Sequence, residues 1–262
     1  MVASGRMQAL RDKKQRGEPI TALTAYDYPT ARLLDEAGLD VILVGDSLGM
    51  VVLGYEDTTE VTLDEMVHHT RAVARAVKRA VLVADMPFHT YDTPALALAT
   101  ARRLAAAGAQ AVKLEGGSTH VAQIEAIVGA GIPLMGHIGM LPQSVRQEGG
   151  YKLKGRTEAE AEALIRDGRA VEEAGAFAVV LEIVQADTAR RVTEALQIPT
   201  IGIASGENCD GQILVTHDLI GLFPWFVPKF VRPEADVAAE IRKAANAFIE
   251  RTTAQRRLTA KV

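Results

Sequence analysis

The sequence is poor in cysteine and has no long uncharged apolar run, and each shortage excludes a class of protein. Cys209 is the one cysteine in 262 residues, which excludes an internal disulfide and fits a reducing cytoplasm. The longest hydrophobic stretch, 39–55, is interrupted by Asp40 and Asp46, whereas a membrane span needs about 20 mostly apolar residues. The first residues become charged before an apolar segment forms, so we expect no signal peptide, no membrane partner and a cytoplasmic protein.

An excess of positive charge is also missing. The chain carries 29 basic and 33 acidic side chains, for a net charge of −4 with histidines neutral. Binding to a phosphate backbone needs a broad basic surface. We therefore expect no nucleic-acid partner.

Short β-branched runs alternate along the chain with longer segments rich in Ala, Leu, Glu and Arg, which is typical of repeated β-α units. Three joints between a helix and a strand contain a glycine (Gly38, Gly108 and Gly175), where a left-handed residue would end the helix. We expect strands at 20–24, 41–46, 80–85, 109–115, 132–137, 176–183, 200–203 and 212–216, with the clearest helices at 63–79, 94–107, 157–174 and 234–250.

Eight buried parallel strands in a chain of this length predict an α/β fold, an eight-stranded (β/α)8 TIM barrel, as a single domain over 1–262. The amphipathic segment 7–16 is expected to be a helix that covers the barrel floor, and the basic tail 250–262 a solvated helix end. An open doubly wound sheet is the alternative. It is disfavoured because neither a Gly-x-Gly-x-x-Gly turn follows the first strand nor a phosphate loop is present.

Polar residues collect at the predicted carboxyl ends of the strands, where TIM barrels carry their active sites. Asp46 and Asp85 end neighbouring strands, and two hard carboxylate ligands with positions left for water and substrate suit Mg²⁺. Glu115 is a possible outer partner of that metal site. The competing interpretation is that each aspartate only caps the following helix.

Lys113 and Glu115 lie two residues apart on one strand and should project to the same side, into the barrel mouth, while Val112 and Leu114 face the outer helices. Lys113 could form a Schiff base with a carbonyl substrate or hold a substrate carboxylate by its charge. A structural ion pair between Lys113 and Glu115 is the third interpretation.

Glu182 ends an otherwise apolar strand, where a raised pKa would make it a base, although a salt-bridged strand end is the rival interpretation. His137 ends a strand between glycines that let a ligand approach closely, so we expect it to contact substrate or folate. Cys209 has no basic partner near it in the sequence and is not expected to be a nucleophile.

Seven specific motifs are spread over about residues 20–230. They are Thr-Ala-Tyr-Asp-Tyr at 24–28, Val-Gly-Asp-Ser-Leu-Gly-Met at 44–50, Val-Ala-Asp-Met-Pro-Phe at 83–88, Val-Lys-Leu-Glu-Gly at 112–116, Gly-His-Ile-Gly-Met-Leu-Pro-Gln at 136–143, Gly-Gly-Tyr-Lys at 149–152 and Asp-Gly-Gln-Ile-Leu-Val-Thr-His-Asp at 210–218. With these motifs the chain closely resembles the ketopantoate hydroxymethyltransferase (3-methyl-2-oxobutanoate hydroxymethyltransferase) family. One departure is Ala204-Ser205 in Gly-Ile-Ala-Ser-Gly at 202–206, where the family commonly has Gly-Ala.

The resemblance implies a transferase of pantothenate and coenzyme A biosynthesis. Such an enzyme moves a hydroxymethyl group from 5,10-methylenetetrahydrofolate to 3-methyl-2-oxobutanoate, through a Mg²⁺-stabilised enolate, and gives 2-dehydropantoate and tetrahydrofolate. It also implies a homo-oligomer, typically a decamer. Carried over by motif, Asp46 and Asp85 would bind Mg²⁺, with Glu115 joining the metal site; Ser47 and Lys113 would hold the keto acid. Glu182 would remove the C3 proton.

Three other functions compete with this one. Another Mg²⁺-dependent lyase or aldolase of the phosphoenolpyruvate/pyruvate barrel type would share the metal and enolate chemistry but would not use methylenetetrahydrofolate. A Schiff-base aldolase would use Lys113 as its nucleophile without a metal. A non-catalytic binding barrel would have little reason to gather these charged residues at its strand ends.

Overall fold

The computed structural model describes residues 2–259, and the side chains of residues 5–256. These residues form two compact units, Met1–Ile213 and Leu214–Val262. The first unit contains nearly all of the expected β-α repeats. The assignment of the whole chain to a single domain stays a prediction.

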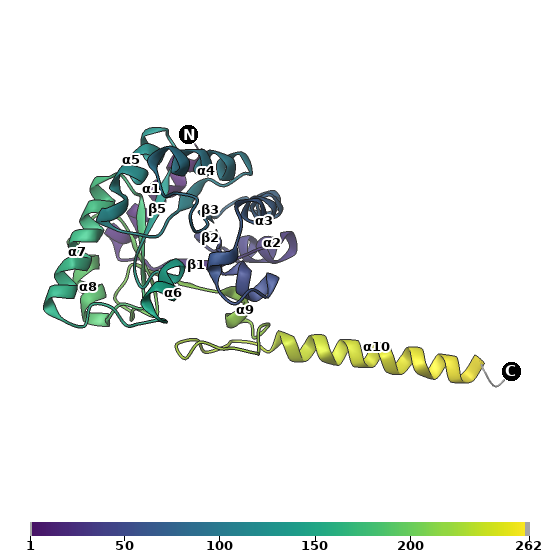
Figure 1. Cartoon of the computed structure of the whole chain (residues 1–262). Helices are drawn as coiled ribbons and strands as arrows, with labels where there is room; N and C mark the ends of the chain where they lie inside the picture. Colours follow the sequence, from purple (N-terminus) through teal and green to yellow (C-terminus); the bar gives the residue numbers. More distant parts are fainter. Residues whose placement is uncertain (1, 260–262) are drawn as a thin grey trace. The chain divides into compact units, whose positions relative to one another are not determined.

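The strands form a closed barrel in the order of the sequence, with helices around it (Figure 1). Neighbouring strands from β1 to β8 pair in parallel, and the amide of Ile20 donates to the carbonyl of Asp210 at 2.9 Å where the barrel closes. The TIM-barrel prediction is confirmed. The strands are β1 (Ile20–Thr24), β2 (Val41–Val44), β3 (Val81–Asp85), β4 (Ala111–Lys113), β5 (Leu134–Gly139), β6 (Ala178–Glu182), β7 (Thr200–Ile203) and β8 (Gly211–Leu214).

The helices begin and end where the sequence provides caps. Asp27, Thr62, Thr93 and Thr157 each accept an amide of the following first turn. The three glycines at the helix-to-strand joints all have the expected left-handed backbone, with φ between 93° and 110°. The helices of the first unit are α1 (Val2–Arg16), α2 (Tyr28–Ala37), α3 (Leu63–Ala76), α4 (Pro94–Ala106), α5 (Val121–Gly129), α6 (Val145–Glu148), α7 (Glu158–Glu173) and α8 (Ala186–Ala195), with short π or 3₁₀ turns at Gly49–Leu53, Thr58–Glu60, Ser118–His120 and Pro142–Ser144.

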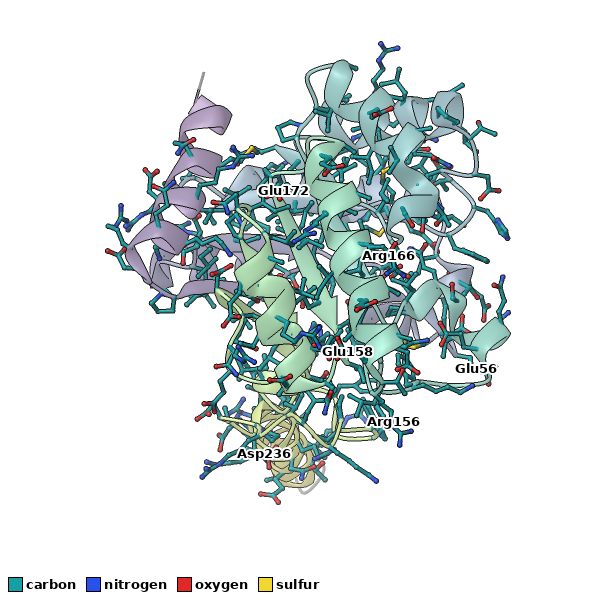
Figure 2. All side chains as sticks on the ribbon, turned by 90° about the vertical axis from the view of Figure 1, so that its left-hand side faces the viewer. Glu56, Arg156, Glu158, Arg166, Glu172 and Asp236 are labelled. Carbon is teal, nitrogen blue, oxygen red and sulfur yellow. The ribbon has the colours of Figure 1, made fainter. Side chains whose placement is uncertain are left out.

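Each long outer helix has one apolar face toward the strands. In α7 the buried residues are spaced three to four apart (Ala161, Leu164, Gly168 and Val171). Glu158, Arg166 and Glu172 are spread along the same helix in Figure 2. The Glu158 carboxylate pairs with Arg191 of α8 at 2.6 Å and so joins two neighbouring helices at their surface.

Apolar side chains form two buried layers, as alternation along the strands requires. The outer layer lies between strands and helices and includes Val112 and Leu114, as the sequence predicted. The inner layer fills the barrel with Val81, Val83 and Ala111, among others. Continuing the inner positions of β3 and β4 by two residues reaches Asp85 and Lys113, so strand geometry alone directs both side chains into the barrel mouth.

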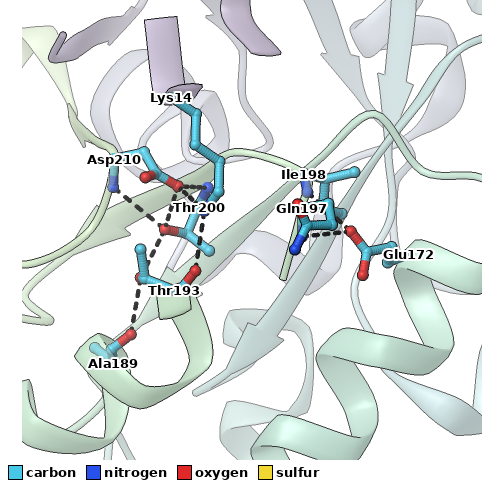
Figure 3. Close-up of polar contacts among 8 residues, drawn as sticks. All are labelled: Lys14, Glu172, Ala189, Thr193, Gln197, Ile198, Thr200 and Asp210. Atoms are coloured by element: carbon cyan, nitrogen blue, oxygen red, sulfur yellow. Dashed lines mark hydrogen bonds and ion pairs between the residues drawn. The ribbon is translucent and has the colours of Figure 1, made fainter. Parts of the chain in front are cut away.

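Helix α1 covers the segment 7–16 that was expected to lie against the barrel floor, and it packs on the inside of the barrel. Its Met7 and Leu10 join the inner apolar layer. Lys14 reaches Asp210 at 2.7 Å, and the same carboxylate accepts the Thr200 amide at 2.8 Å (Figure 3). The floor is therefore held by an ion pair that also fixes the start of β7.

The second unit contains α9 (Thr216–Leu219) and α10 (Val237–Thr259). Helix α10 extends nine residues beyond the predicted end at 250, and its side chains at 250–256 are exposed, as expected for a solvated helix end. Residues 260–262 of the predicted tail lie outside the described residues. Among the helices of the described chain, none has the length and apolar character needed to cross a membrane.

Candidate active site

The strand ends bring the predicted charged residues together. Asp85 ends β3 and lies in register with Lys113, the last residue of β4. His137 lies on β5, and Glu182 ends β6 in register with Gly139 of β5. Asp46 follows β2 by two residues. These side chains come from neighbouring strands and meet at one end of the barrel.

Asp46, Asp85 and Lys113 form one side of the site. The Asp85 carboxylate accepts the Asp46 amide through Oδ2 at 3.0 Å, and its Oδ1 lies 2.5 Å from Lys113 Nζ. Lys113 and Asp85 are both nearly inaccessible to solvent. The hydrogen bonds of the two aspartate carboxylates go to the Asp46 amide and to the Gln143 side chain, not to the first turn of a following helix, so the two residues do more than cap helices.

Glu115, His137 and Glu182 form the other side. His137 Nε2 lies 3.3 Å from Glu182 Oε2, and its Nδ1 lies 3.6 Å from Glu115 Oε1. The imidazole thus separates two carboxylates. Gly139, at φ 101°, lies so close to the Glu182 backbone that an added Cβ would collide with the Glu182 carbonyl oxygen. Glycine at this position lets β5 lie close to Glu182.

Gln143 is a site residue to which the sequence reasoning assigned no role. Its Nε2 donates to Asp46 Oδ2 at 2.8 Å and its backbone amide donates to Glu115 Oε2 at 3.0 Å. Its amide oxygen accepts the hydroxyl of buried Tyr91, which fixes the orientation of the amide. Gln143 therefore connects the two halves of the site. A polar residue ending the otherwise apolar Met-Leu-Pro at 140–142 was the available signal.

Ser47 lies at the edge of this cluster. Its hydroxyl hydrogen-bonds with the Tyr26 hydroxyl at 2.8 Å. A Cβ on Gly45 would lie 2.8 Å from Ser47 Oγ and 3.4 Å from Asp85 Oδ2. Gly45 thus leaves the space between the serine and the aspartate free.

Cys209 lies outside this charged cluster, and burial raises the pKa of its thiol to about 11, which opposes a nucleophilic role.

Burial dominates the electrostatics of the site. It raises the pKa of Glu182 to about 8 against an opposing effect of Lys113, and it raises the pKa of Asp46 to about 7, helped by the charge of Asp85. Burial also raises the pKa of Glu115 well above its usual range. It lowers the pKa of His137 well below the usual range, and Lys113 adds to that effect, so the imidazole is neutral.

The donor chemistry fits a divalent cation. Four carboxylates (Asp46, Asp85, Glu115 and Glu182) face one ammonium group, Lys113, so the ionised cluster lacks positive charge. Within the described part of the chain, no three His, Cys, Asp or Glu side chains converge as a complete metal-binding group. That is compatible with two direct carboxylate ligands, Asp46 and Asp85, completed by water and substrate.

Comparison with known proteins identifies the family. The family model of ketopantoate hydroxymethyltransferase matches residues 5–256. The chain belongs to this family. It is 57% identical over 231 residues to the 3-methyl-2-oxobutanoate hydroxymethyltransferase of Moorella thermoacetica, with 87% of this chain and 86% of the relative covered. The protein of that name from Thermoanaerobacter sp. is 52% identical over 243 residues, covering 92% and 89%. The predicted class, an enzyme of the hydroxymethyltransferase kind, is therefore confirmed.

Solved structures of lower identity share the barrel. A 2,3-dimethylmalate lyase of the PEP mutase/isocitrate lyase superfamily superimposes with a TM-score of 0.65 at 20% identity, covering 94% of this chain and 87% of the lyase. A phosphonopyruvate hydrolase in complex with oxalate and Mg²⁺ gives a TM-score of 0.59 at 18% identity, covering 96% and 87%. At this identity the likeness establishes the fold alone.

Proposed function

We propose that this enzyme transfers a hydroxymethyl group from 5,10-methylenetetrahydrofolate to 3-methyl-2-oxobutanoate and releases 2-dehydropantoate and tetrahydrofolate. The observation that carries the proposal is the buried contact of Asp46, Asp85 and Lys113, together with Glu182, whose carboxylate lies against His137 in the same barrel mouth. The group of Asp46, Asp85 and Lys113 suits a 2-oxo acid, and the Glu182 carboxylate suits the removal of a proton beside its carbonyl group. The name shared by the relatives supports the same reaction.

Asp46 and Asp85 would hold Mg²⁺, with Glu115 reaching it through water. When bound, the metal supplies positive charge that stabilises the negative charge developing on the keto oxygen. Burial and the charge of Asp85 raise the pKa of Asp46 to about 7, and Asp46 would have to lose its proton before it could coordinate the metal. This chain's residues thus favour cation binding at neutral rather than acidic pH.

Lys113 would bind the substrate carboxylate by charge, with Ser47 near the substrate oxygens. The Schiff-base interpretation is disfavoured, because Lys113 lies against Asp85 and the neighbouring carboxylates raise the pKa of its amine above the usual range. A Schiff base requires a neutral amine. Lys113 is also the counter-charge that a buried Asp85 needs.

Glu182 would remove the C3 proton. A carboxylate whose pKa is raised to about 8 is a stronger base than an exposed glutamate, and the fraction that is ionised rises from about a tenth at pH 7 to half at about pH 8. His137, neutral and 3.3 Å from Glu182, limits where that carboxylate can point and remains a predicted substrate contact. In the net reaction, C3 forms a bond to the methylene carbon of the folate, and both bonds from that carbon to folate nitrogens break. Water supplies the hydroxyl oxygen, and the proton from C3 and one proton from that water end on the two nitrogens of the released tetrahydrofolate.

The direct test is turnover of both substrates. Purified enzyme with 3-methyl-2-oxobutanoate, methylenetetrahydrofolate and Mg²⁺ should form tetrahydrofolate and 2-dehydropantoate in equal amounts. EDTA should stop the reaction and added Mg²⁺ should restore it. Turnover of the keto acid without folate consumption would favour the lyase or aldolase alternative instead. Cytoplasmic location and a homo-oligomeric, decameric assembly are further parts of this proposal, supported by the family resemblance.

A further inference from the structure

One loop runs between the two halves of the site. The segment 143–154 follows β5 and contains the short helix α6. At its start, the Gln143 side chain donates to the predicted metal ligand Asp46 at 2.8 Å. At its end, the Lys154 amide donates at 2.9 Å to the carbonyl of Ile183, the residue that directly follows the proposed base. The loop therefore crosses the barrel mouth from the predicted metal ligands to the proposed base.

Tyr151 lies in the middle of the last part of this loop. The Glu148 carboxylate pairs with the Lys154 ammonium group and ties the two ends of that part together. Gly149 and Gly150, at φ 70° and 116°, turn the chain back just before Tyr151. An ion pair that closes a loop reduces the number of conformations open to it. A ring carried by such a loop is therefore largely ordered before a ligand arrives, which lowers the entropy cost of binding.

The Tyr151 side chain faces both the site and the solvent. Its exposed fraction is 50%. Burial nevertheless raises the pKa of its hydroxyl above the usual range, and the charges of Glu182, Asp46 and Glu115 raise this pKa further. Three carboxylates of the site act on one phenol only when its hydroxyl lies near them. The hydroxyl is therefore directed toward the site, and the ring is left open at the mouth.

The solvent side of the site is the side of Glu182. The Glu182 side chain is 15% exposed, whereas the side chains of Glu115 and Asp85 are 3% and 4% exposed. In the proposed function the buried groups hold the small keto acid, so the larger second substrate has to arrive from the solvent side. The methylene carbon of that substrate is bonded to two nitrogens, each next to a flat ring. At least one of these rings must remain at the mouth when the carbon reaches C3.

We propose that Tyr151 is a binding residue for methylenetetrahydrofolate, whose flat ring system packs against the Tyr151 ring at the barrel mouth. The inference rests on the proposed function, in which the second substrate is a folate. Contact between an aromatic side chain and a flat heterocycle is favourable and needs only one open face of the ring. The keto acid has no ring and gains nothing from this contact.

Removal of the ring should weaken folate binding alone. Tyr151→Ala should raise the KM for methylenetetrahydrofolate about 10- to 100-fold, the usual effect of losing an aromatic side chain that stacks on a heterocycle. Tyr151→Phe keeps the ring and loses only the hydroxyl, so its KM should stay within about threefold of wild type. Because half of the side chain is exposed, both variants should fold and keep the wild-type urea midpoint.

Two measurements separate this role from a role toward the keto acid. Deuterium exchange at C3 of 3-methyl-2-oxobutanoate with Mg²⁺ needs no folate, so Tyr151→Ala should exchange within about twofold of the wild-type rate. Tetrahydrofolate lacks the methylene carbon and cannot react, so calorimetry with keto acid and Mg²⁺ present measures its binding directly. Its Kd should rise about 10- to 100-fold in Tyr151→Ala. Leu33→Ala, which removes an exposed apolar side chain from α2, is the control and should change neither quantity.

The outcomes are distinct. Weaker folate binding with normal C3 exchange in Tyr151→Ala, together with near-normal binding in Tyr151→Phe, supports the proposal. Unchanged folate affinity in Tyr151→Ala overturns it, and so does slowed C3 exchange, which would assign Tyr151 to the keto acid. An equal loss of affinity in Tyr151→Phe also overturns it, because the hydroxyl rather than the ring would then make the contact. Failure of the wild-type enzyme to consume methylenetetrahydrofolate would instead contradict the proposed function itself.

Discussion

The stability of the metal-free enzyme should fall as pH rises, and Glu182 should account for a definite part of the fall. Burial raises the pKa of Glu182 from 4.5 to about 8. The folded state therefore binds a proton that the unfolded state releases. The stabilisation is fully present below pH 4.5 and is lost as pH rises through about 8.

The magnitude follows from the two pKa values. Each pH unit between them changes the free energy of unfolding by about 1.4 kcal/mol. Integration from about pH 5.5 to about pH 8.0, where the folded carboxyl is half ionised, gives a loss of about 3 kcal/mol from Glu182 alone. The raised pKa values of Asp46 and Glu115 act in the same direction, so the wild-type loss should be larger.

Glu182→Gln should remove this part of the pH dependence. Glutamine resembles the neutral carboxylic acid in size, and it cannot ionise. In chelated buffer, urea unfolding at fixed protein concentration should show that the fall between pH 5.5 and pH 8.0 is about 3 kcal/mol smaller in the variant than in wild type. Glu173→Gln, which removes an exposed carboxylate from α7, is the matched control and should leave the fall unchanged.

Two results would refute this reasoning. A wild-type enzyme that gains stability between pH 5.5 and pH 8.0 would show that the cluster is not short of positive charge. A Glu182→Gln variant with the full wild-type pH dependence would show that the Glu182 carboxyl is solvated and ordinary. Addition of Mg²⁺ should reduce the fall in wild type, because bound cation offsets the repulsion among the ionised carboxylates.

Three further predictions concern single residues. Sodium borohydride added with 3-methyl-2-oxobutanoate should leave no covalent adduct on the protein, because Asp85 holds Lys113 as an ammonium ion. Mass spectra of the intact protein and of its peptides check this, and a mass increase on Lys113 would contradict it. Gln143→Leu should weaken Mg²⁺ binding by about 10- to 100-fold, measured by calorimetry, because Asp46 loses the side-chain amide that orients its carboxylate, whereas the backbone amide that Glu115 accepts is kept. Unchanged affinity would remove the Gln143 side chain from the site. Lys14→Met should cost about 2–4 kcal/mol of stability at the barrel floor, measured by urea unfolding, with an unchanged KM; a loss under about 0.5 kcal/mol would show that the ion pair with Asp210 is dispensable.

The sequence predicts the barrel because its information is local and repeated. Apolar strands, helix caps and left-handed glycines such as Gly38 each follow from near neighbours in the chain. The observed bounds of β1 and β7 agree with the predicted ones. Strand β4 is shorter than predicted, Ala111–Lys113 rather than 109–115, because strand bounds depend on pairing with neighbouring strands and not on the strand's own sequence alone. There the chain leaves the ladder after Lys113, although Glu115 still points into the site.

The site residues that lie at the ends of strands were predictable from the sequence. Asp85, Lys113 and Glu182 are placed by strand ends, so alternation alone directs them to the barrel mouth. Gln143 was not assigned a role, because it lies in a loop and makes its contacts with residues that are distant in the sequence. Its side chain contacts Asp46, which lies 97 positions away.

Deuterium exchange at C3 tests the central claim most directly, since it isolates proton removal from the folate step. Wild-type enzyme with Mg²⁺ and 3-methyl-2-oxobutanoate in D₂O should exchange the C3 hydrogen without folate, followed by loss of the methine proton signal. Glu182→Gln should slow this exchange by about 10²- to 10⁴-fold, the usual contribution of a general base, while the keto acid still binds. Exchange at the wild-type rate in Glu182→Gln would contradict the account and place the base elsewhere.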